Sequence, residues 1–258
     1  MTYELKKLGP ERYLVWDLLR ETDPYYLNHH LIDVDFSAVE ACRQQWRDAG
    51  RPPPTYLAFA LSAYAKGLQA FPEINSYLRL WPFLRLAVYN GVDTALTIER
   101  KWQGRSIILL AILRDAQNLS LGEISAFLHR RKTAPLEELE EFASYRWLLR
   151  LPAFCRWHLF QLFCKPFPGI MRRLVGTTAF TSIGKFGSNF TVSLSPRSST
   201  LSFGKVEVRP RSKSGGVVSC LSAWLSLSYD HRIADGAYVA QMGKFIKDSL
   251  ETVNEPPE

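Results

Sequence analysis

A histidine on a tight turn between an apolar strand and a helix is the feature that most constrains this chain. The run Leu225–Ala237 reads LSLSYDHRIADGA, so leucine and serine alternate ahead of His231. Alternation with a period of two indicates a half-buried strand, and the apolar residues from Ala237 onward recur at helical spacing. A lone histidine is more often a packing or surface residue. Rigid elements on both sides favour function, because imidazole titrates near neutral pH and acts as a general base when held in place.

The chain length and composition indicate a globular protein with a full core. The 258 residues are 47% hydrophobic and 22% charged, and we expect one domain over 1–258. The formal charge of +7 suits an anionic partner, which leaves nucleic acid, acidic lipid or a phosphate-bearing carrier such as coenzyme A. The basic residues are scattered and match no nucleic-acid-binding motif. Nucleic acid is therefore not expected as a partner.

Neither the cysteines nor the N-terminus indicates export. The four cysteines lack metal-ligand spacing, which favours reduced and mostly buried thiols: Cys42, Cys155, Cys164 and Cys220. The first seven residues lack the apolar core of a signal peptide, and no apolar run reaches the roughly 18 residues of a membrane-spanning helix. These patterns predict a cytoplasmic protein.

The remaining histidines do not form a metal-binding pattern. His29 and His30 are adjacent in an expected strand, where successive side chains point to opposite faces. They cannot readily share a metal ion. His129 and His158 are expected at the surface or in packing. We therefore predict no metal.

Periodicity and capping residues predict alternating strands and helices. Thr55 is a candidate N-cap, and Ser120 with Glu123 forms a capping box. The expected helices cover 12–20, 36–49, 55–71 and 119–131. The expected strands cover 25–34, 78–89, 94–99 and 106–114.

The His231 turn resembles the His-x-x-x-Asp-Gly signature of the chloramphenicol acetyltransferase superfamily. Its Asp-His-Arg-x-x-Asp-Gly form is similar to the catalytic (E2) acyltransferase domain of 2-oxoacid dehydrogenase complexes. Three further segments resemble that domain in the same order: 72–75 (PEIN), 92–98 (VDTALTI) and 116–124. The resemblance runs from about Pro24 to Leu250.

This resemblance implies a two-layer α/β fold, in which helices pack against a mixed central sheet. It implies a homotrimer whose active sites lie between subunits. The implied reaction moves an acyl group from a thioester of coenzyme A, or of a pantetheine or lipoyl arm, to a thiol, hydroxyl or amine. His231 would be the base, with no covalent acyl-enzyme. The chain has no Gly-x-Ser-x-Gly elbow of serine hydrolases.

The resemblance also assigns an oxyanion donor. The family uses a hydroxyl in a glycine-containing turn, and the corresponding segment here is 179–187 (AFTSIGKFG). Aligning the two glycines puts Thr181 at the position of the family's serine, with Ser182 beside it. Threonine donates the same hydrogen bond through a stiffer side chain. Thr181 is the first candidate and Ser182 the second.

Four further residues take structural roles by the same resemblance. Asp235 is expected to form a salt bridge that shapes the histidine turn, with Arg20 as a candidate partner. Gly236 is expected to let the turn close through a backbone shape that other residues resist. Arg232 follows the family pattern, and its role is left open.

The chain departs from the family in two places. From the short stretch before Tyr25 we expect neither a lipoyl domain nor a subunit-binding domain. The family's Gly-Leu-x-x-Pro stretch is replaced by 104–109 (GRSIIL). Both departures favour a role outside a conventional dehydrogenase complex.

An unusual aromatic and basic segment covers about 145–174, where Pro152, Pro166 and Pro168 predict short helices. We favour plain packing with solvated arginines. A lid over an acyl channel comes second, and peripheral membrane contact is least favoured because prolines interrupt the amphipathic face.

Two rivals to the general acyltransferase stay open. One is a stand-alone dihydrolipoyl acyltransferase core that works with a separate lipoyl or acyl carrier protein. The other is a non-catalytic trimeric scaffold. The intact His231 turn argues against this second rival.

Overall fold

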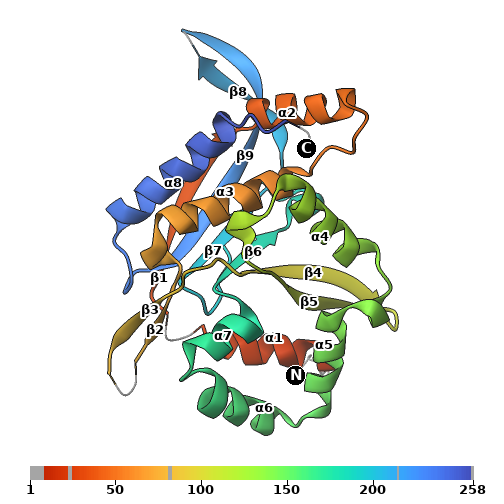
Figure 1. Ribbon diagram of the computed structural model, residues 1–258, viewed down its shortest axis with the longest axis vertical. Coiled ribbons are helices and arrows are strands. Elements are labelled where there is room, and N and C mark those ends of the chain that lie inside the picture. Colours follow the sequence, from red (N-terminus) through yellow and green to blue (C-terminus); the bar gives the residue numbers. More distant parts are fainter. Residues whose placement is uncertain (1–8, 23–24, 81–82, 214, 257–258) are drawn as a thin grey trace, which may run out of the picture.

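The chain forms a central mixed sheet, a small separate hairpin and helices that pack around them (Figure 1). The computed structural model describes residues 9–22, 25–80, 83–213 and 215–256. Its strands are β1 (Leu27–Asp35), β2 (Ser76–Arg79), β3 (Arg85–Val88), β4 (Thr94–Trp102), β5 (Arg105–Leu113), β6 (Thr178–Ser182), β7 (Ser199–Phe203), β8 (Glu207–Lys213) and β9 (Gly216–Asp230). Its α-helices are α1 (Pro10–Arg20), α2 (Ser37–Asp48), α3 (Tyr56–Ala70), α4 (Leu121–Thr133), α5 (Glu140–Arg150), α6 (Ala153–Leu159), α7 (Pro168–Val175) and α8 (Gly236–Glu251).

The sheet order is β1-β9-β7-β6-β4-β5, and β8 pairs with the first half of β9. The pairs β4–β6 and β6–β7 are parallel and the other pairs are antiparallel. β9 is the longest strand, and along its length it pairs with β1, β7 and β8. The expected mixed central sheet is confirmed.

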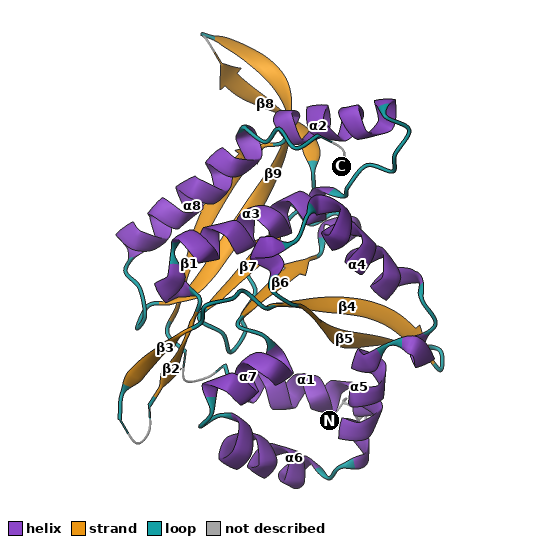
Figure 2. Cartoon of the chain, in the orientation of Figure 1, coloured by secondary structure: helices purple, strands orange, loops and turns teal. Residues whose placement is uncertain are grey.

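Helices α3 and α8 lie side by side on one face of the sheet (Figure 2). α3 is apolar on nearly every side, which suits a helix enclosed between the sheet and other helices. The helices approach closely at Gly67, where an added Cβ would lie 3.2 Å from Cγ1 of Ile246. The side chains that face these helices form the main core, which includes Leu96, Leu201 and Leu227.

The segment around 145–174 belongs to a group of helices beyond the β4–β5 edge, where α1, α5, α6 and α7 gather (Figure 2). A smaller core joins α5 to β5 and consists of Ile107, Leu109, Leu139, Phe142 and Tyr145. The prolines do divide the segment into short helices, as predicted. Between α6 and α7 the chain makes a π-helical turn, Phe160–Cys164.

Most expected elements are confirmed within a few residues. Thr55 caps α3 by accepting a hydrogen bond from the amide of Ala58, and Ser120 with Glu123 forms the capping box of α4. The strand expected over 78–89 is wrong. The chain reverses there and forms the hairpin β2–β3, which pairs Arg79 with Arg85. Apolar alternation alone does not separate one long strand from two hairpin arms.

None of the helices in the described ranges is long and apolar enough to cross a membrane.

Candidate functional site

The turn after β9 presents His231 at the surface. The amide of His231 donates a hydrogen bond to the carbonyl of Tyr26, 2.8 Å away, which ties the turn to the chain that enters β1. His231 is exposed, and its ring centroid lies 5.8 Å from that of Tyr229. The turn ends at Gly236, where α8 begins. The imidazole is therefore accessible to a ligand and held between two regular elements.

An ion pair inside the turn fixes its shape. Asp230 is fully buried at the end of β9, and Arg232 lies two residues further on. Nε of Arg232 lies 2.9 Å from Oδ1 and 3.1 Å from Oδ2 of Asp230, and the Arg232 amide donates to Oδ1 at 3.1 Å. The hydrogen bond to Asp230 raises the pKa of Arg232. The sequence analysis left the role of Arg232 open and missed Asp230, although opposite charges flank His231.

The Arg232 guanidinium also lies over two aromatic rings. Its Cζ is 5.2 Å from the ring centroid of Tyr25 and 5.6 Å from that of Tyr26. Contacts of this kind add cation–π attraction to the ion pair. Arg232 therefore joins the turn both to the end of β9, through Asp230, and to the chain that enters β1, through the two tyrosines.

The expected salt bridge between Asp235 and Arg20 is wrong. The Asp235 carboxylate accepts a hydrogen bond of 2.9 Å from the amide of Tyr238, so it is the N-cap of α8. The guanidinium of Arg20 lies 5.2 Å from the ring centroid of Trp157. An exposed carboxylate at a helix start is satisfied by free amides and the helix dipole, so it needs no arginine.

The expected role of Gly236 is also wrong. Gly236 is the first residue of α8 and is absent from the described glycines with positive φ. An added Cβ would meet only the Tyr229 hydroxyl at 3.7 Å, which is an ordinary contact. The turn closes without any backbone shape peculiar to glycine.

Thr181 and Ser182 lie in the last part of β6, ahead of the turn that contains Gly184 and Gly187. The hydroxyl oxygen of Thr181 is 3.1 Å from that of Thr97 on β4. Its side chain points to the sheet face opposite the helices, because Phe180 faces the core. If Thr97 is the donor in this pair, the Thr181 hydroxyl can donate to a ligand on the open face of the sheet.

The sheet register separates Thr181 from His231 within one chain. Thr181 pairs with Ser202 of β7, and Ser202 pairs with Ser226 of β9. His231 follows Ser226 by five residues. Strand geometry then puts the two side chains about 15–20 Å apart, which is too far for both to contact one reacting carbonyl.

Two cavities flank Tyr25 beside the histidine turn. The first has a volume of about 420 Å³, and its wall includes Tyr25, Arg232 and Leu162. The second has a volume of about 400 Å³, and its wall includes Tyr25 and His29. Leu162 belongs to the aromatic and basic segment, so part of that segment lines a cavity and does more than pack on β5.

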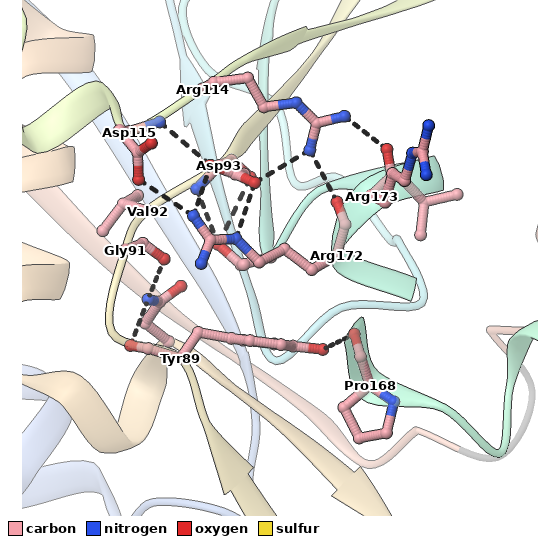
Figure 3. Close-up of polar contacts among 12 residues, drawn as sticks. Tyr89, Gly91, Val92, Asp93, Arg114, Asp115, Pro168, Arg172 and Arg173 are labelled. Carbon is pink, nitrogen blue, oxygen red and sulfur yellow. Dashed lines mark hydrogen bonds and ion pairs between the residues drawn. The ribbon is translucent and has the colours of Figure 1, made fainter. Parts of the chain in front are cut away.

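The same segment is anchored by a buried carboxylate (Figure 3). Asp93 accepts from Nε of Arg172 at 2.8 Å and from Nη1 of Arg114 at 2.9 Å, and its Oδ1 accepts from the Asp115 amide at 3.0 Å. Burial alone would raise the pKa of Asp93, but these hydrogen bonds outweigh burial and hold it below its ordinary value. The network joins α7 to the start of β4 and so holds the cavity wall.

His29 and His30 face opposite sides of β1, as predicted. Nδ1 of His29 lies 2.9 Å from the hydroxyl oxygen of Ser228 on the open face, and burial lowers the pKa of His29. His30 faces α8, where an added Cβ on Gly243 would lie 2.8 Å from its ring. The described residues contain no cluster of three or more His, Cys, Asp or Glu side chains that could hold a metal ion.

The remaining histidines are at the surface, as the sequence indicated, whereas only two of the four cysteines are buried. His129 and His158 are exposed. All four cysteines are free thiols; Cys42 and Cys220 are buried, whereas Cys155 and Cys164 are partly exposed.

Solved structures of known proteins define the fold class. A probable dihydrolipoamide acetyltransferase from Listeria monocytogenes superposes with a TM-score of 0.69 at 18% identity, over 99% of this chain and 97% of that one. A chloramphenicol acetyltransferase gives a TM-score of 0.53 at 14% identity, over 97% and 99% of the two chains. The fold is that of the chloramphenicol acetyltransferase-like superfamily.

Sequence comparison shows which protein family the chain resembles. A family model described as 2-oxoacid dehydrogenases acyltransferase (catalytic domain) matches residues 174–256. The dihydrolipoyllysine-residue succinyltransferase component of the 2-oxoglutarate dehydrogenase complex of Pseudomonas aeruginosa is 36% identical over 202 residues, which are 76% of this chain and 40% of that protein. Residues 174–256 therefore resemble the catalytic domain of the 2-oxoacid dehydrogenase acyltransferases, and the whole chain shares the fold of the dihydrolipoamide acetyltransferase and of chloramphenicol acetyltransferase. The chain spans 40% to 50% of the length of the curated relatives that it matches.

Proposed function

We propose that the chain is an acyltransferase that uses His231 as a general base on a thioester substrate. The observation that carries this proposal is the His231 turn. The imidazole is exposed, its backbone is tied to Tyr26, and the ion pair between Arg232 and the buried Asp230 holds the turn. A base must be positioned before it is useful, and this turn provides that position beside two cavities.

The proposed step balances without any covalent enzyme intermediate. His231 takes the proton from the acceptor thiol, hydroxyl or amine, and the acceptor attacks the thioester carbonyl carbon. The carbonyl oxygen becomes an oxyanion that accepts a hydrogen bond from Thr181, with Ser182 as the second candidate. The carbon–sulfur bond then breaks, and the leaving thiolate takes the proton back from His231.

The active site is proposed to lie between subunits of a homotrimer. The separation of Thr181 from His231 along the sheet supports this arrangement, because one chain cannot bring both to the same carbonyl. A neighbouring copy would supply Thr181 opposite His231. A solved relative described as the cubic core of the pyruvate dehydrogenase multienzyme complex shares the fold, with a TM-score of 0.70 at 20% identity.

The donor class remains a choice between coenzyme A and a carrier arm. The curated relatives are named as dihydrolipoyllysine-residue transferases, which supports the alternative of an acyltransferase core that works with a lipoyl protein. In this proposal the two cavities, which share Tyr25, take the donor and the acceptor.

Thiol release tests the proposal. Wild type and His231→Ala are incubated with a panel of acyl-CoAs and with acylated lipoamide, with and without acceptor. We expect the variant to lose about 10²–10⁴-fold of the acceptor-dependent rate. His129→Ala is the matched control, because His129 is exposed on α4 and far from the turn in sequence.

The panel also separates the rivals. Turnover with acyl-lipoamide and none with acyl-CoA would favour the lipoyl-dependent core. Equal rates for wild type and His231→Ala with every donor would contradict the acyltransferase proposal and favour a trimeric scaffold.

A further inference from the structure

The first cavity carries one cation without a partner. Its wall includes Arg79, Lys165 and Arg232. Lys165 pairs with Glu21 at 2.9 Å, and Arg232 pairs with Asp230 at 2.5 Å. Within the described part of the chain, Arg79 has no ion pair, and its Nε is buried without a hydrogen-bond acceptor. A buried donor without an acceptor lowers the stability of the fold by about 1–3 kcal/mol. An anionic ligand that accepts a hydrogen bond from this guanidinium would remove that cost.

The position of Arg79 in the hairpin is a second feature that destabilises the fold in the absence of a ligand. Arg79 of β2 is the register partner of Arg85 of β3. Like charges directly across an antiparallel pair destabilise it. Arg79 therefore gains no counter-ion from the facing strand, and Arg85 itself does not line the cavity.

A further uncompensated charge lies near the same wall. Arg197 is 6% exposed, and within the described residues its side chain donates hydrogen bonds to the backbone carbonyls of Val175 and Pro196. Its electrostatic neighbours include Tyr25 and Tyr77, which both line the cavity. Burial raises the pKa of both tyrosines, so at neutral pH they are uncharged and do not balance Arg197. Glu21 and Asp230 are the acidic neighbours of these tyrosines, and they are paired with Lys165 and Arg232, so the charges of Arg79 and Arg197 are not balanced by them.

The rest of the wall is apolar. Leu78, Leu80, Leu162 and Pro166 line the cavity together with the charged groups. A wall of this composition suits an organic chain that carries an anionic group, rather than a free inorganic ion. The residue after His231, Arg232, forms part of the same wall, which places the cavity next to the proposed base.

We propose that this cavity binds an oxyanion of the thioester donor and that Arg79 is the residue that pairs with it. The proposal rests on the proposed acyltransferase function and names a feature of its substrate. Two sources supply the same chemistry. One is a phosphate of coenzyme A, and the other is a terminal carboxylate on the acyl chain. Guanidinium binds either group through parallel hydrogen bonds.

Four donors separate the two sources. Butyryl and succinyl groups are each presented as the coenzyme A thioester and as the phosphate-free N-acetylcysteamine thioester. Arg79→Gln is compared with wild type and with Arg85→Gln, a matched control on the same hairpin that does not line the cavity. If Arg79 pairs with phosphate, the variant lowers kcat/KM about 10–100-fold for both coenzyme A donors. If Arg79 pairs with carboxylate, the loss is confined to both succinyl donors.

Binding is measured separately from turnover. Calorimetry compares coenzyme A with pantetheine, and succinate with the uncharged butyramide, on wild type and both variants. Anion binding that Arg79→Gln loses and Arg85→Gln keeps supports the subsite, even if no donor turns over and the proposed function fails. Turnover that is unchanged in Arg79→Gln for all four donors overturns the subsite and leaves the proposed function intact. Wild type that binds none of the anions also overturns it.

A second variant guards against misfolding. Arg79→Lys keeps the charge and removes the two-pronged geometry, so we expect an intermediate loss with the same donor pattern. A loss that is equal for all four donors in both Arg79 variants would indicate a general structural defect and would contradict the proposal.

Discussion

Asp230 and Arg232 form a two-pronged ion pair across His231, in which Nε of Arg232 donates to Oδ1 of Asp230 at 2.9 Å and Nη2 donates to Oδ2 at 2.5 Å. The pair joins the last residue of β9 to the turn that carries the proposed base. Asp230 is fully buried, so the pair cannot rearrange without exposing a charge or leaving it unpaired. The pair therefore holds the backbone of the turn on both sides of His231.

Breaking this pair should cost stability and slow the reaction. Arg232→Gln leaves the Asp230 carboxylate buried without its partner, and we expect a loss of about 2–4 kcal/mol in the free energy of unfolding. We expect kcat to fall, because Arg232 positions His231. Urea denaturation and initial rates measure the two effects.

A matched control and a double variant sharpen this test. Lys244→Ala removes an exposed pair with Asp248 on α8 and should change stability by less than about 0.5 kcal/mol. Asp230→Asn combined with Arg232→Gln should recover part of the lost stability. A stable Arg232→Gln with full kcat would contradict the positioning role.

Mixed trimers should recover activity from two inactive variants. His231→Ala and Thr181→Ala are expected to be inactive alone, each losing one part of the site. When the two chains are co-expressed, a site that takes His231 from one subunit and Thr181 from its neighbour is intact. Random mixing should restore about a quarter of the sites.

Tandem affinity tags on the two variants allow mixed trimers to be purified and assayed. Thr181→Ser is the conservative control and should remain active, because serine donates the same hydrogen bond. Mixed trimers with no more activity than the separate variants would argue against a site between subunits.

The Asp93 network should make stability depend on pH at the acid end. The pKa of Asp93 is lower in the fold than its ordinary value of about 3.9, so the unfolded chain binds its proton more readily. The stabilising contribution is therefore present above pH 4 and is lost as the pH falls through the folded pKa. Asp93→Asn should lose about 2–3 kcal/mol at pH 7, at the low end for a broken buried pair because its arginines are partly exposed.

Chemical denaturation at steps from pH 7 to pH 3 measures this effect. The acid limb of the stability curve should be flatter for Asp93→Asn than for wild type. Asp248→Asn is the control, because Asp248 is an exposed carboxylate in α8. An acid limb with the same slope in wild type and Asp93→Asn would show that other carboxylates account for it.

Two glycines near the candidate site should respond oppositely to alanine. An added Cβ on Gly184 would lie 2.6 Å from the carbonyl oxygen of Gly204, so Gly184→Ala must displace backbone and should cost about 1–3 kcal/mol. Gly236→Ala meets only an ordinary contact and should be neutral within about 0.5 kcal/mol or slightly stabilising. Melting temperatures compare the two. A large loss in Gly236→Ala would restore the role that the sequence assigned to it.

Local signals in the sequence were sufficient for the helix starts and for the His231 turn. Thr55 and Ser120 cap the helices that follow them, because a cap depends on residues within one turn of helix. The alternation before His231 and the helical spacing after it likewise determined the strand, the turn and the helix. These features depend on neighbours in the chain, which a sequence displays directly.

Only the tertiary structure decided what surrounds the turn. The distance of Thr181 from His231 follows from the register of three strands, and the unpartnered state of Arg79 follows from packing among segments far apart in sequence. The sequence also assigned Asp235 and Gly236 to the shape of the turn, whereas Asp230 and Arg232 hold it. Burial and partner choice depend on the whole fold, so no local pattern reveals them.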